Sequence, residues 1–435
     1  MKQLSVKTLG WRMAGLVAGL FVGQVGAWAL NVQQSVHRPR PEQHLMQTHH
    51  AAKGHAVAKG RAAAHAGKTE SAAKAEAAAP ATGVRRVSLH GRHKKVFNER
   101  FTASSFAQGQ AEGDVTTGED PVIRQAAIDA LGDMNGTAVV IDPSNGRVLA
   151  MVNQKLALSP GAEPCSTIKI TVAMAALSEG IVNRDTMVPL GGFRMNMTQA
   201  LAHSNNLYFE ALGRQLGFER VHHYATQFGL GELAGYNIPG EQLGTYPDEE
   251  LPAKEGGVGR MCSFGQGVSL TPLQLGAYVA AIANGGTLYY LQHPTTSDAI
   301  ASFQPKVKRQ LDIAKYTPEM LDGMAGAVEF GTARRLRANF QEFPVFGKTG
   351  TCSDKGTRFG WFASYVDAPQ GRLVAVFFLE GGRPTFGPRA AELTGLFYKG
   401  LQEHDYFKPQ QAQSLLPAVT VVPVSHPEVK PALQP

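Results

Sequence analysis

Three short motifs along the chain combine residues that can carry out acyl transfer. Ser166-Thr-Ile-Lys169 places a hydroxyl and an amine at positions i and i+3, which lie on the same face of a helix. In the first turn of that helix the macrodipole favours an anionic serine oxygen and disfavours a protonated lysine. A neutral lysine can then act as the base that a serine nucleophile needs. The spacing alone is weak evidence, because Ser71-Ala-Ala-Lys74 repeats it in a segment that we expect to be unstructured.

The second and third motifs are polar clusters further along the chain. In Ser204-Asn-Asn206 the hydroxyl could relay a proton and the Asn206 amide could hold a substrate amide. Lys348-Thr349-Gly350 falls on an expected edge strand, where an exposed lysine and a hydroxyl can hold a carboxylate and glycine lets a ligand approach the backbone. The next backbone amide, that of Thr351, can point at an oxyanion. Taken singly, each motif is better explained as a turn, a helix cap or a solvated strand.

The elements that must position these motifs can be predicted from local patterns. Pro164 precedes and Gly180 ends a helix over residues 166–179, which is apolar on nearly every face and should be buried. The order of the predicted elements is a hairpin first, helices in the middle and three strands at the end. This order predicts an α+β fold, in which both ends of the domain build one antiparallel sheet. The remaining predicted elements are a helix over 121–131, hairpin strands over 136–142 and 147–151, a helix beginning at Thr271-Pro272, and strands over 345–351, 359–366 and 373–379.

The charge of the chain is unevenly distributed. Residues 1–110 contain 16 Lys and Arg against 4 Asp and Glu, a net charge of +12, whereas the whole chain carries +7, so that residues 111–435 carry −5. No Phe, Trp or Tyr occurs between Trp28 and Phe97, which argues against a folded nucleic-acid-binding unit. The basic segment suits an anionic lipid or wall polymer.

The ends of the chain differ in composition from its middle. Lys2, Lys7 and Arg12 precede an apolar run over 13–30, which predicts either a signal anchor or a cleaved signal peptide and an extracytoplasmic location for the rest. The sequence therefore predicts an N-terminal membrane segment over 1–30 and a disordered Ala/His/Lys-rich linker over 31–116. It predicts a folded domain over 117–406 and a Pro-rich tail over 407–435.

The three motifs, in this order and in these contexts, are the signature set of penicillin-recognising serine enzymes. Over nearly all of residues 119–400 the chain resembles penicillin-binding protein transpeptidase domains, and after Ser204 it is most similar to the class B branch. Class B members usually carry a pedestal domain between anchor and catalytic domain, and we expect only a low-complexity linker at that place in this sequence. The similar stretches are Ala138–Met151, Ser204–Gly213, Gly229–Glu241, Ser263–Gly267, Thr271–Gln274, Gly331–Ala333, Gly347–Thr351 and Gly360–Phe362.

The resemblance implies both a fold and a chemistry. The fold is a three-layer α/β/α arrangement with a five-stranded antiparallel sheet and an all-helical lobe, and the site lies at their junction. Ser166 would attack the D-alanyl-D-alanine stem peptides of peptidoglycan, with Lys169 as base and Ser204 as the proton relay to the leaving group. The resemblance assigns substrate binding to Asn206, Lys348, Thr349 and Gly350, and the oxyanion hole to the backbone amides of Ser166 and Thr351.

The resemblance also implies the ligands and partners. It implies no cofactor and no metal, so that the pair His222-His223 is interpreted as ordinary helix surface. The expected partners are stem peptides, β-lactam antibiotics, the membrane through the N-terminus, and proteins of cell-wall synthesis, but no nucleic acid. The expected location is the cell membrane, with the catalytic domain in the periplasm.

Other functions on the same fold remain open at this point. One is a serine β-lactamase, although a class A enzyme would carry a Glu-x-x-Leu-Asn stretch, and none occurs between Asn206 and Lys348. A D,D-carboxypeptidase would use water instead of an acceptor amine. A β-lactam sensor, which is a binding module, would need a cytoplasmic effector, and only about a dozen residues precede the apolar run.

The three cysteines lie close to the motifs. In the fold that the chain resembles, Cys165 and Cys352 flank the same cleft, and some carbapenem-hydrolysing class A β-lactamases carry a disulfide at matching positions. The resemblance therefore implies a Cys165–Cys352 bond, with Cys262 free beside Ser263. The alternative is that the two cysteines are neighbouring buried thiols.

Overall fold

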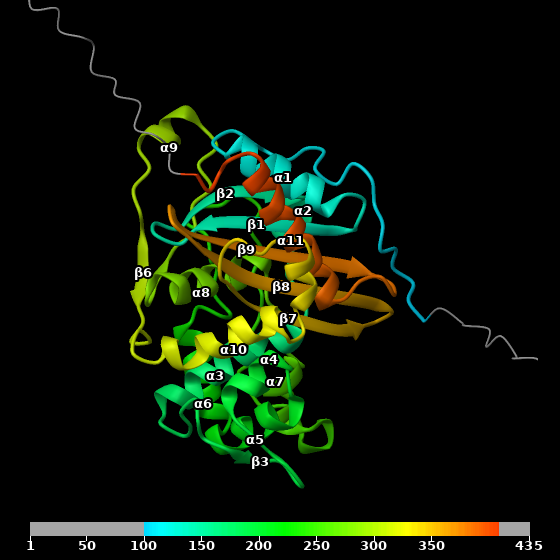
Figure 1. The fold of residues 1–435 in the computed structure, drawn as a ribbon, viewed down its shortest axis with the longest axis vertical. Helices are drawn as coiled ribbons and strands as arrows, with labels where there is room; N and C mark the ends of the chain where they lie inside the picture. Colours follow the sequence, from blue (N-terminus) through cyan, green and yellow to red (C-terminus); the bar gives the residue numbers. More distant parts are fainter. Residues whose placement is uncertain (1–99, 409–435) are drawn as a thin grey trace, which may run out of the picture. The chain divides into compact units, whose positions relative to one another are not determined.

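The computed structural model of the protein describes residues 100–408, whose centre is a five-stranded antiparallel sheet in the order β2-β1-β9-β8-β7 (Figure 1). Because β1 pairs with β9, the first hairpin and the last three strands share one sheet, which confirms the predicted α+β fold. The late strands extend beyond their predicted ends. The strands are β1 (Gly136–Asp142), β2 (Arg147–Val152), β7 (Val345–Asp354), β8 (Thr357–Ala368) and β9 (Gly371–Gly381).

Helices cover both faces of this sheet. On one face α1 (Pro121–Leu131) and α11 (Gly387–Glu403) pack against each other, and α8 (Pro272–Asn284) covers the other. Successive residues of β9 point to opposite faces, so that Phe377 joins the core under α1 and α11 while Phe378 joins the core under α8. Burial on both faces explains why the sequence of β9 is almost continuously apolar.

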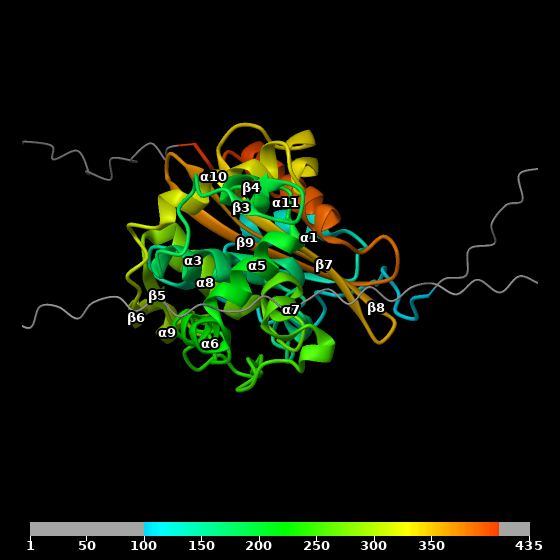
Figure 2. The ribbon, with the colours of Figure 1, turned by 90° about the horizontal axis from the view of Figure 1, so that it is seen from below.

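A second group of helices forms a lobe beside β7, as both views of the ribbon show (Figures 1 and 2). This lobe contains α3 (Lys169–Ser178), α4 (Met197–Ala202), α5 (Asn206–Leu216), α6 (Phe218–Gln227) and α7 (Gly257–Phe264). α10 (Thr317–Glu329) packs on both α4 and β7 and so joins the lobe to the sheet. The site motifs meet at this junction.

The remaining elements are short. α8 begins as predicted, because the Thr271 side chain accepts from Gln274 N and the Gln274 side chain accepts from Thr271 N. Two small hairpins were not predicted, since each strand has only two to four residues: β3 (Val188–Pro189) with β4 (Arg194–Met195), and β5 (Thr287–Tyr289) with β6 (Val307–Gln310). The other short elements are α2 (Gln154–Ala157), η1 (Cys165–Ile168), η2 (Ala253–Glu255), α9 (Ser297–Ala301) and η3 (Arg334–Ala338).

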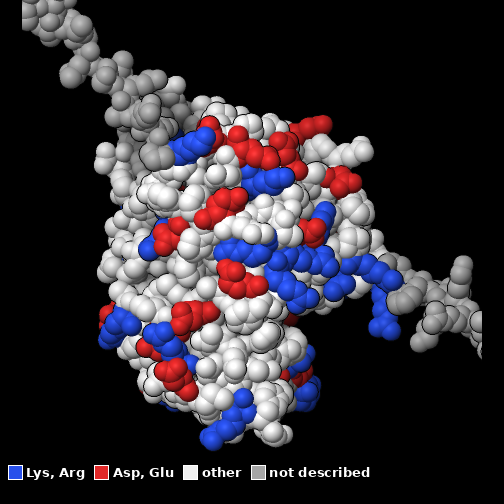
Figure 3. Space-filling model, viewed as in Figure 1, with Lys and Arg blue, Asp and Glu red and all other residues white. Residues whose placement is uncertain are grey.

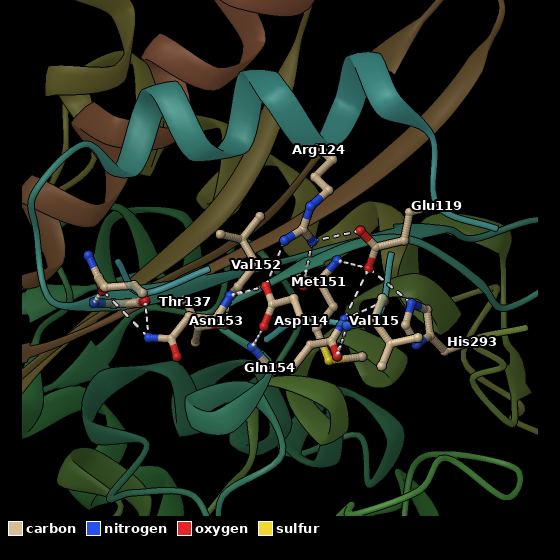
Figure 4. Close-up of polar contacts among 12 residues, drawn as sticks. Asp114, Val115, Glu119, Arg124, Thr137, Met151, Val152, Asn153, Gln154 and His293 are labelled. Atoms are coloured by element: carbon tan, nitrogen blue, oxygen red, sulfur yellow. Dashed lines mark hydrogen bonds and ion pairs between the residues drawn. The ribbon is translucent and has the colours of Figure 1, made fainter. Parts of the chain in front are cut away.

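The segment before α1 belongs to the fold, so the prediction of a disordered linker up to residue 116 is wrong over residues 101–116. Asp114 accepts from Asn153 N at 2.9 Å and pairs with Arg124 at 2.7 Å, and Glu119 accepts from Met151 N at 3.0 Å (Figure 4). These side chains satisfy the free edge of β2, which would otherwise present unpaired backbone groups. The polar composition of this segment suggested a linker. The carboxylates of Asp114 and Glu119 nevertheless fix the segment to the fold, because they bind Arg124 and the backbone amides of Met151 and Asn153.

The other predicted boundaries fall near the ends of the described region. Phe407 is buried in the core under α11, so the fold extends past the predicted end at residue 406. The predicted membrane segment over 1–30 and nearly all of the predicted tail lie outside the described residues. Within residues 100–408, no helix has both the length and the apolar character needed to cross a bilayer.

Candidate active site

The predicted nucleophile lies in a turn of 3-10 helix. We predicted one α-helix from Ser166 onward, but η1 comes first and α3 begins only at Lys169. In a 3-10 helix residues i and i+3 eclipse each other, and the Lys169 amine lies 3.0 Å from the Ser166 hydroxyl oxygen. Cys165, just before the serine, has φ +52°, a left-handed conformation that is uncommon for a residue with a side chain and occurs often at functional sites.

The amine of Lys169 is fully buried among oxygen acceptors. Its nitrogen lies 2.6 Å from the Asn206 Oδ1 atom, 2.8 Å from the Ser204 carbonyl oxygen and 3.1 Å from the Ser204 hydroxyl oxygen. Burial, together with the nearby charge of Lys348 and against a smaller effect of Glu210, lowers the pKa of Lys169 to about 6. The helix dipole, which the sequence argument invoked, is therefore not needed. At neutral pH Lys169 is mostly the free base.

Ser204 lies between two lysines. Its hydroxyl accepts from Lys169 and from Lys348, the latter at 2.9 Å, and its backbone has φ +56°. The next residue, Asn205, caps α5 by accepting from Tyr208 N at 3.0 Å. The helix-cap interpretation of this motif is thus correct for Asn205, while Ser204 and Asn206 face the amine of Lys169.

Lys348 is buried, which contradicts our prediction of an exposed side chain. We predicted an exposed lysine on an edge strand; β7 is the last strand of the sheet, but the Lys348 side chain is fully buried because η1 and α10 cover this strand. Its amine donates to the Ser204 hydroxyl and to the Thr349 carbonyl, at 2.9 and 3.0 Å. Burial lowers the pKa of Lys348 to about 7. The two lysines therefore share one hydroxyl and resist being charged together.

Close packing holds the turn of Ser166 against β7. A Cβ atom at Gly350 would lie 2.7 Å from the Pro164 carbonyl oxygen, so only glycine allows this approach. Trp361 on β8 donates to the Glu163 carbonyl at 3.0 Å. Cys165 and Cys352 are joined in a disulfide with their Cα atoms 5.5 Å apart, and Cys262 is free and buried. These contacts bring the backbone of Ser166 beside that of Thr351.

Thr332 is a member of the site that the sequence argument did not assign a role. Its hydroxyl oxygen lies 2.6 Å from that of Thr349, and its amide donates to the Ala202 carbonyl at 3.1 Å. Thr332 therefore connects the strand that carries Lys348 with the helix that leads to Ser204. The recurrent stretch Gly331-Thr-Ala333 was the signal that could have identified it.

Nothing in the described residues suggests a metal centre. No group of three or more His, Cys, Asp or Glu side chains within residues 100–408 is arranged to hold a metal ion. His222 lies 3.7 Å from the exposed Asp248, and the His223 ring contacts that of Tyr224 on the same helix. Both histidines are on α6.

The fold and this site together place a serine within hydrogen-bond reach of a lysine amine, at the junction of a sheet and a helical lobe. Residues 136–394 match the model of the penicillin binding protein transpeptidase domain, and the chain belongs to this family. The predicted family membership is thereby confirmed.

Curated relatives and solved structures agree with this assignment. The chain is 31% identical over 257 residues to stage V sporulation protein D of Bacillus subtilis, covering 49% of this chain and 39% of that protein. It is 25% identical over 390 residues to the peptidoglycan D,D-transpeptidase MrdA of Acinetobacter baumannii, covering 70% and 57%. The chain thus spans less than two thirds of the length of these relatives.

Two crystal structures show the same fold. One is the D,D-transpeptidase domain of a peptidoglycan glycosyltransferase from Eggerthella lenta, with a TM-score of 0.52, 22% identity, and coverage of 66% of this chain and 82% of that one. The other is PBP2 of Pseudomonas aeruginosa in complex with WCK 5153, with a TM-score of 0.57, 23% identity, and coverage of 71% and 78%. The predicted fold class is confirmed by these neighbours.

Proposed function

We propose that this chain is a peptidoglycan D,D-transpeptidase that acts through an acyl-enzyme on Ser166. The observation that carries the proposal is the Lys169 amine, which lies 3.0 Å from the Ser166 hydroxyl in a buried site that keeps this amine mostly neutral. A neutral amine within hydrogen-bond reach of a hydroxyl is the geometry of a general base with its nucleophile. Curated relatives that bear the name peptidoglycan D,D-transpeptidase support the same activity.

In the first half-reaction the Ser166 oxygen attacks the carbonyl carbon of the penultimate D-Ala of a stem peptide, and Lys169 takes the hydroxyl proton. The backbone amides of Ser166 and Thr351 donate to the oxyanion that forms. The carbon–nitrogen bond then breaks, Ser204 passes a proton to the leaving D-Ala, and an ester on Ser166 remains. The position of Ser204 between two amines suits this relay, because its proton can be replaced from either lysine.

The other polar groups hold the substrate. Asn206 orients the substrate amide, and Lys348 with Thr349 holds the terminal carboxylate, beside which Gly350 leaves room. A bound carboxylate would favour the charged form of Lys348, so binding would restore the proton that burial disfavours. The Thr332 hydroxyl, 2.6 Å from that of Thr349, can donate to Thr349 and leave its proton free for the carboxylate.

In the second half-reaction an amine from a neighbouring stem attacks the ester, and Ser166 leaves with its proton restored. The product is a peptide cross-link between two strands. If water attacks instead, the outcome is carboxypeptidation. The chemistry described uses only side chains and backbone amides of this chain.

The cellular setting is proposed from the sequence. The cations before the apolar run over 13–30 support an N-terminal membrane anchor or signal, with the catalytic domain on the outer side in the periplasm. In that compartment the domain would meet stem peptides, β-lactam antibiotics and proteins of cell-wall synthesis. An oxidising compartment also suits a Cys165–Cys352 bond.

The test is incubation of the protein with a labelled penicillin, followed by mass spectrometry at set times. We expect a stoichiometric adduct on Ser166 that persists for many minutes, and loss of the adduct in Ser166→Ala but not in Ser71→Ala. Rapid turnover of a chromogenic cephalosporin would show a β-lactamase instead. The absence of any adduct would refute a penicillin-recognising site altogether.

A further inference from the structure

Arginines gather on the surface directly behind the proposed oxyanion strand, where α11 begins. The set comprises one pair from η3, one residue from β8 and two that flank the start of α11, and we call it the arginine face: Arg334, Arg335, Arg358, Arg383 and Arg389. Figure 3 shows Lys and Arg side chains gathered in a band over this part of the molecule. Composition does not account for the band, because residues 111–435 carry a net charge of −5.

One aromatic ring organises the centre of this face. The guanidinium of Arg335 lies 5.0 Å and that of Arg358 5.7 Å from the centroid of the Phe386 ring, both within the range of cation–π contact. Arg358 also donates to the Arg383 carbonyl at 3.3 Å. Two guanidinium groups held on one ring lose little side-chain freedom when an anion binds, which favours recognition of planar acidic groups.

Two arginines of this face, Arg335 and Arg389, share one carboxylate. Glu392 accepts from Arg335 at 3.3 Å and pairs with Arg389 at 3.0 Å, so one carboxylate serves two guanidinium groups. Arg389 also sits in the first turn of α11, where the helix dipole disfavours a cation. Such an arrangement repels itself and gains stability when an anion arrives.

Short stretches of chain join the arginine face to the strand that carries Thr349 and Thr351. Phe386 is followed by Gly387, whose amide donates to the Thr351 hydroxyl at 2.8 Å, and Thr332, which contacts Thr349, lies two residues before Arg334. Arg358 also lies 5.9 Å from the ring of Phe101, near the beginning of the described residues. A polymer held at this face would therefore lie near the strand that carries the proposed carboxylate and oxyanion groups.

We propose that the arginine face binds the carboxylates of peptide-bearing glycan strands, and so holds the polymer whose stem enters the site. This inference rests on the proposed function, because it identifies the polymer as the substrate's own strand. Stem peptides carry several carboxylates besides the terminal one, and fixed guanidinium groups bind carboxylates through paired hydrogen bonds. The face would contribute to capture of the strand rather than to the chemistry at Ser166.

The test is arginine footprinting of the full chain with a dicarbonyl reagent and peptide mass spectrometry. The probe is uncross-linked glycan strands bearing pentapeptide stems, and we expect modification of Arg335 and Arg358 to slow several-fold while Arg184 and Arg220 on the lobe are unaffected. Footprinting locates the contact, so binding by the basic N-terminal region does not obscure it. Equal modification with and without strands would overturn the proposal.

Two further probes identify the ligand chemistry. Chitin oligosaccharides have a sugar backbone without carboxylates, and equal protection by them would overturn a charge-based site. Protection by phosphatidylglycerol vesicles, but not by the strands, would assign the face to a lipid surface and also overturn the proposal. Penicillin adducts measured in the same samples keep the two hypotheses separate: an adduct without protected arginines refutes only the arginine face, and no adduct refutes the proposed function.

A double variant provides an independent measure. In Arg335→Gln/Arg358→Gln we expect the rate of Ser166 acylation by strands to fall relative to that by penicillin, and the difference to shrink as salt is raised. The matched control is Arg184→Gln/Arg220→Gln, which removes two paired surface arginines from the lobe. The same ratio of rates in both double variants would contradict the proposal.

Discussion

The acylation of Ser166 should depend on pH through the two buried lysines, and removing one should move the pH dependence of the other. Burial sets the pKa of Lys169 at about 6, and the charge of Lys348 contributes to lowering it. Acylation needs the neutral form of Lys169, so the rate should rise with pH through this pKa. The neutral fraction of a base with this pKa is about nine tenths at pH 7 and about one tenth at pH 5, so the second-order rate constant should fall about ten-fold between them.

The informative perturbation is Lys348→Met. This change removes the neighbouring charge, so the pKa of Lys169 should rise and the acid limb of the profile should move to higher pH. Loss of the carboxylate contact will lower the acylation rate at every pH. The readout is therefore the pH at which the rate reaches half of its plateau, not the value of the plateau. Because both lysines bond the Ser204 hydroxyl, the wild-type limbs report the pair as a whole.

The assay is labelling by a fluorescent penicillin from pH 4.5 to 9. The second-order rate constant is taken from the labelling rates at low penicillin concentration. Lys399→Met, which removes an exposed lysine on α11, should leave the profile unchanged. If the acid limb of Lys348→Met coincides with that of the wild type, the charge of Lys348 does not act on Lys169. If the wild-type rate at pH 5 equals that at pH 7, Lys169 is not the base.

Three other changes test the support of the site. Thr332→Val should slow acylation by carboxylate-bearing ligands about ten-fold, because the Thr349 hydroxyl, which is proposed to bind the charged carboxylate, loses its hydrogen-bond partner. Thr332→Ser should restore the rate. Equal rates in the two variants would remove Thr332 from the carboxylate site. Removing the disulfide in Cys165→Ala/Cys352→Ala should lower the free energy of unfolding by up to about 5 kcal/mol, the value of the chain-entropy model for a separation of 187 residues. The measurement is denaturant titration against the oxidised wild type. Unchanged stability would contradict a closed disulfide in the native protein. A chain beginning at residue 117 loses Asp114 and leaves Arg124 with only Glu119 as its ion-pair partner, so it should be about 3 kcal/mol less stable than a chain beginning at residue 100. Equal denaturation midpoints for the two chains would show that residues 100–116 contribute no stability.

Much of the fold follows from local patterns in the sequence. The first hairpin and α1 lie where predicted, and α8 begins at its capping box, because each is specified by turn residues, caps and apolar runs within a few positions. The small hairpins were missed because two to four residues carry no periodicity. Residues 101–116 were misjudged because their partners, such as Asn153, lie tens of residues away in the sequence.

The candidate site shows the same division. The sequence by itself determined which groups could act: the hydroxyl of Ser166 one helical turn from the amine of Lys169, a second hydroxyl at Ser204, and a glycine beside Lys348 where a backbone must approach. Ser71 and Lys74 have the same spacing as Ser166 and Lys169, so spacing cannot decide which pair reacts.

The tertiary structure decided the state of those groups. The pKa of Lys169 is lowered by burial under elements that carry Ser204 and Lys348, and Lys348 is buried rather than exposed because η1 and α10 cover its strand. Desolvation and charge repulsion act through space between residues far apart in the chain, and no local pattern records them. Residue types and spacing specify which chemistry is available, and long-range packing sets the protonation that makes it work.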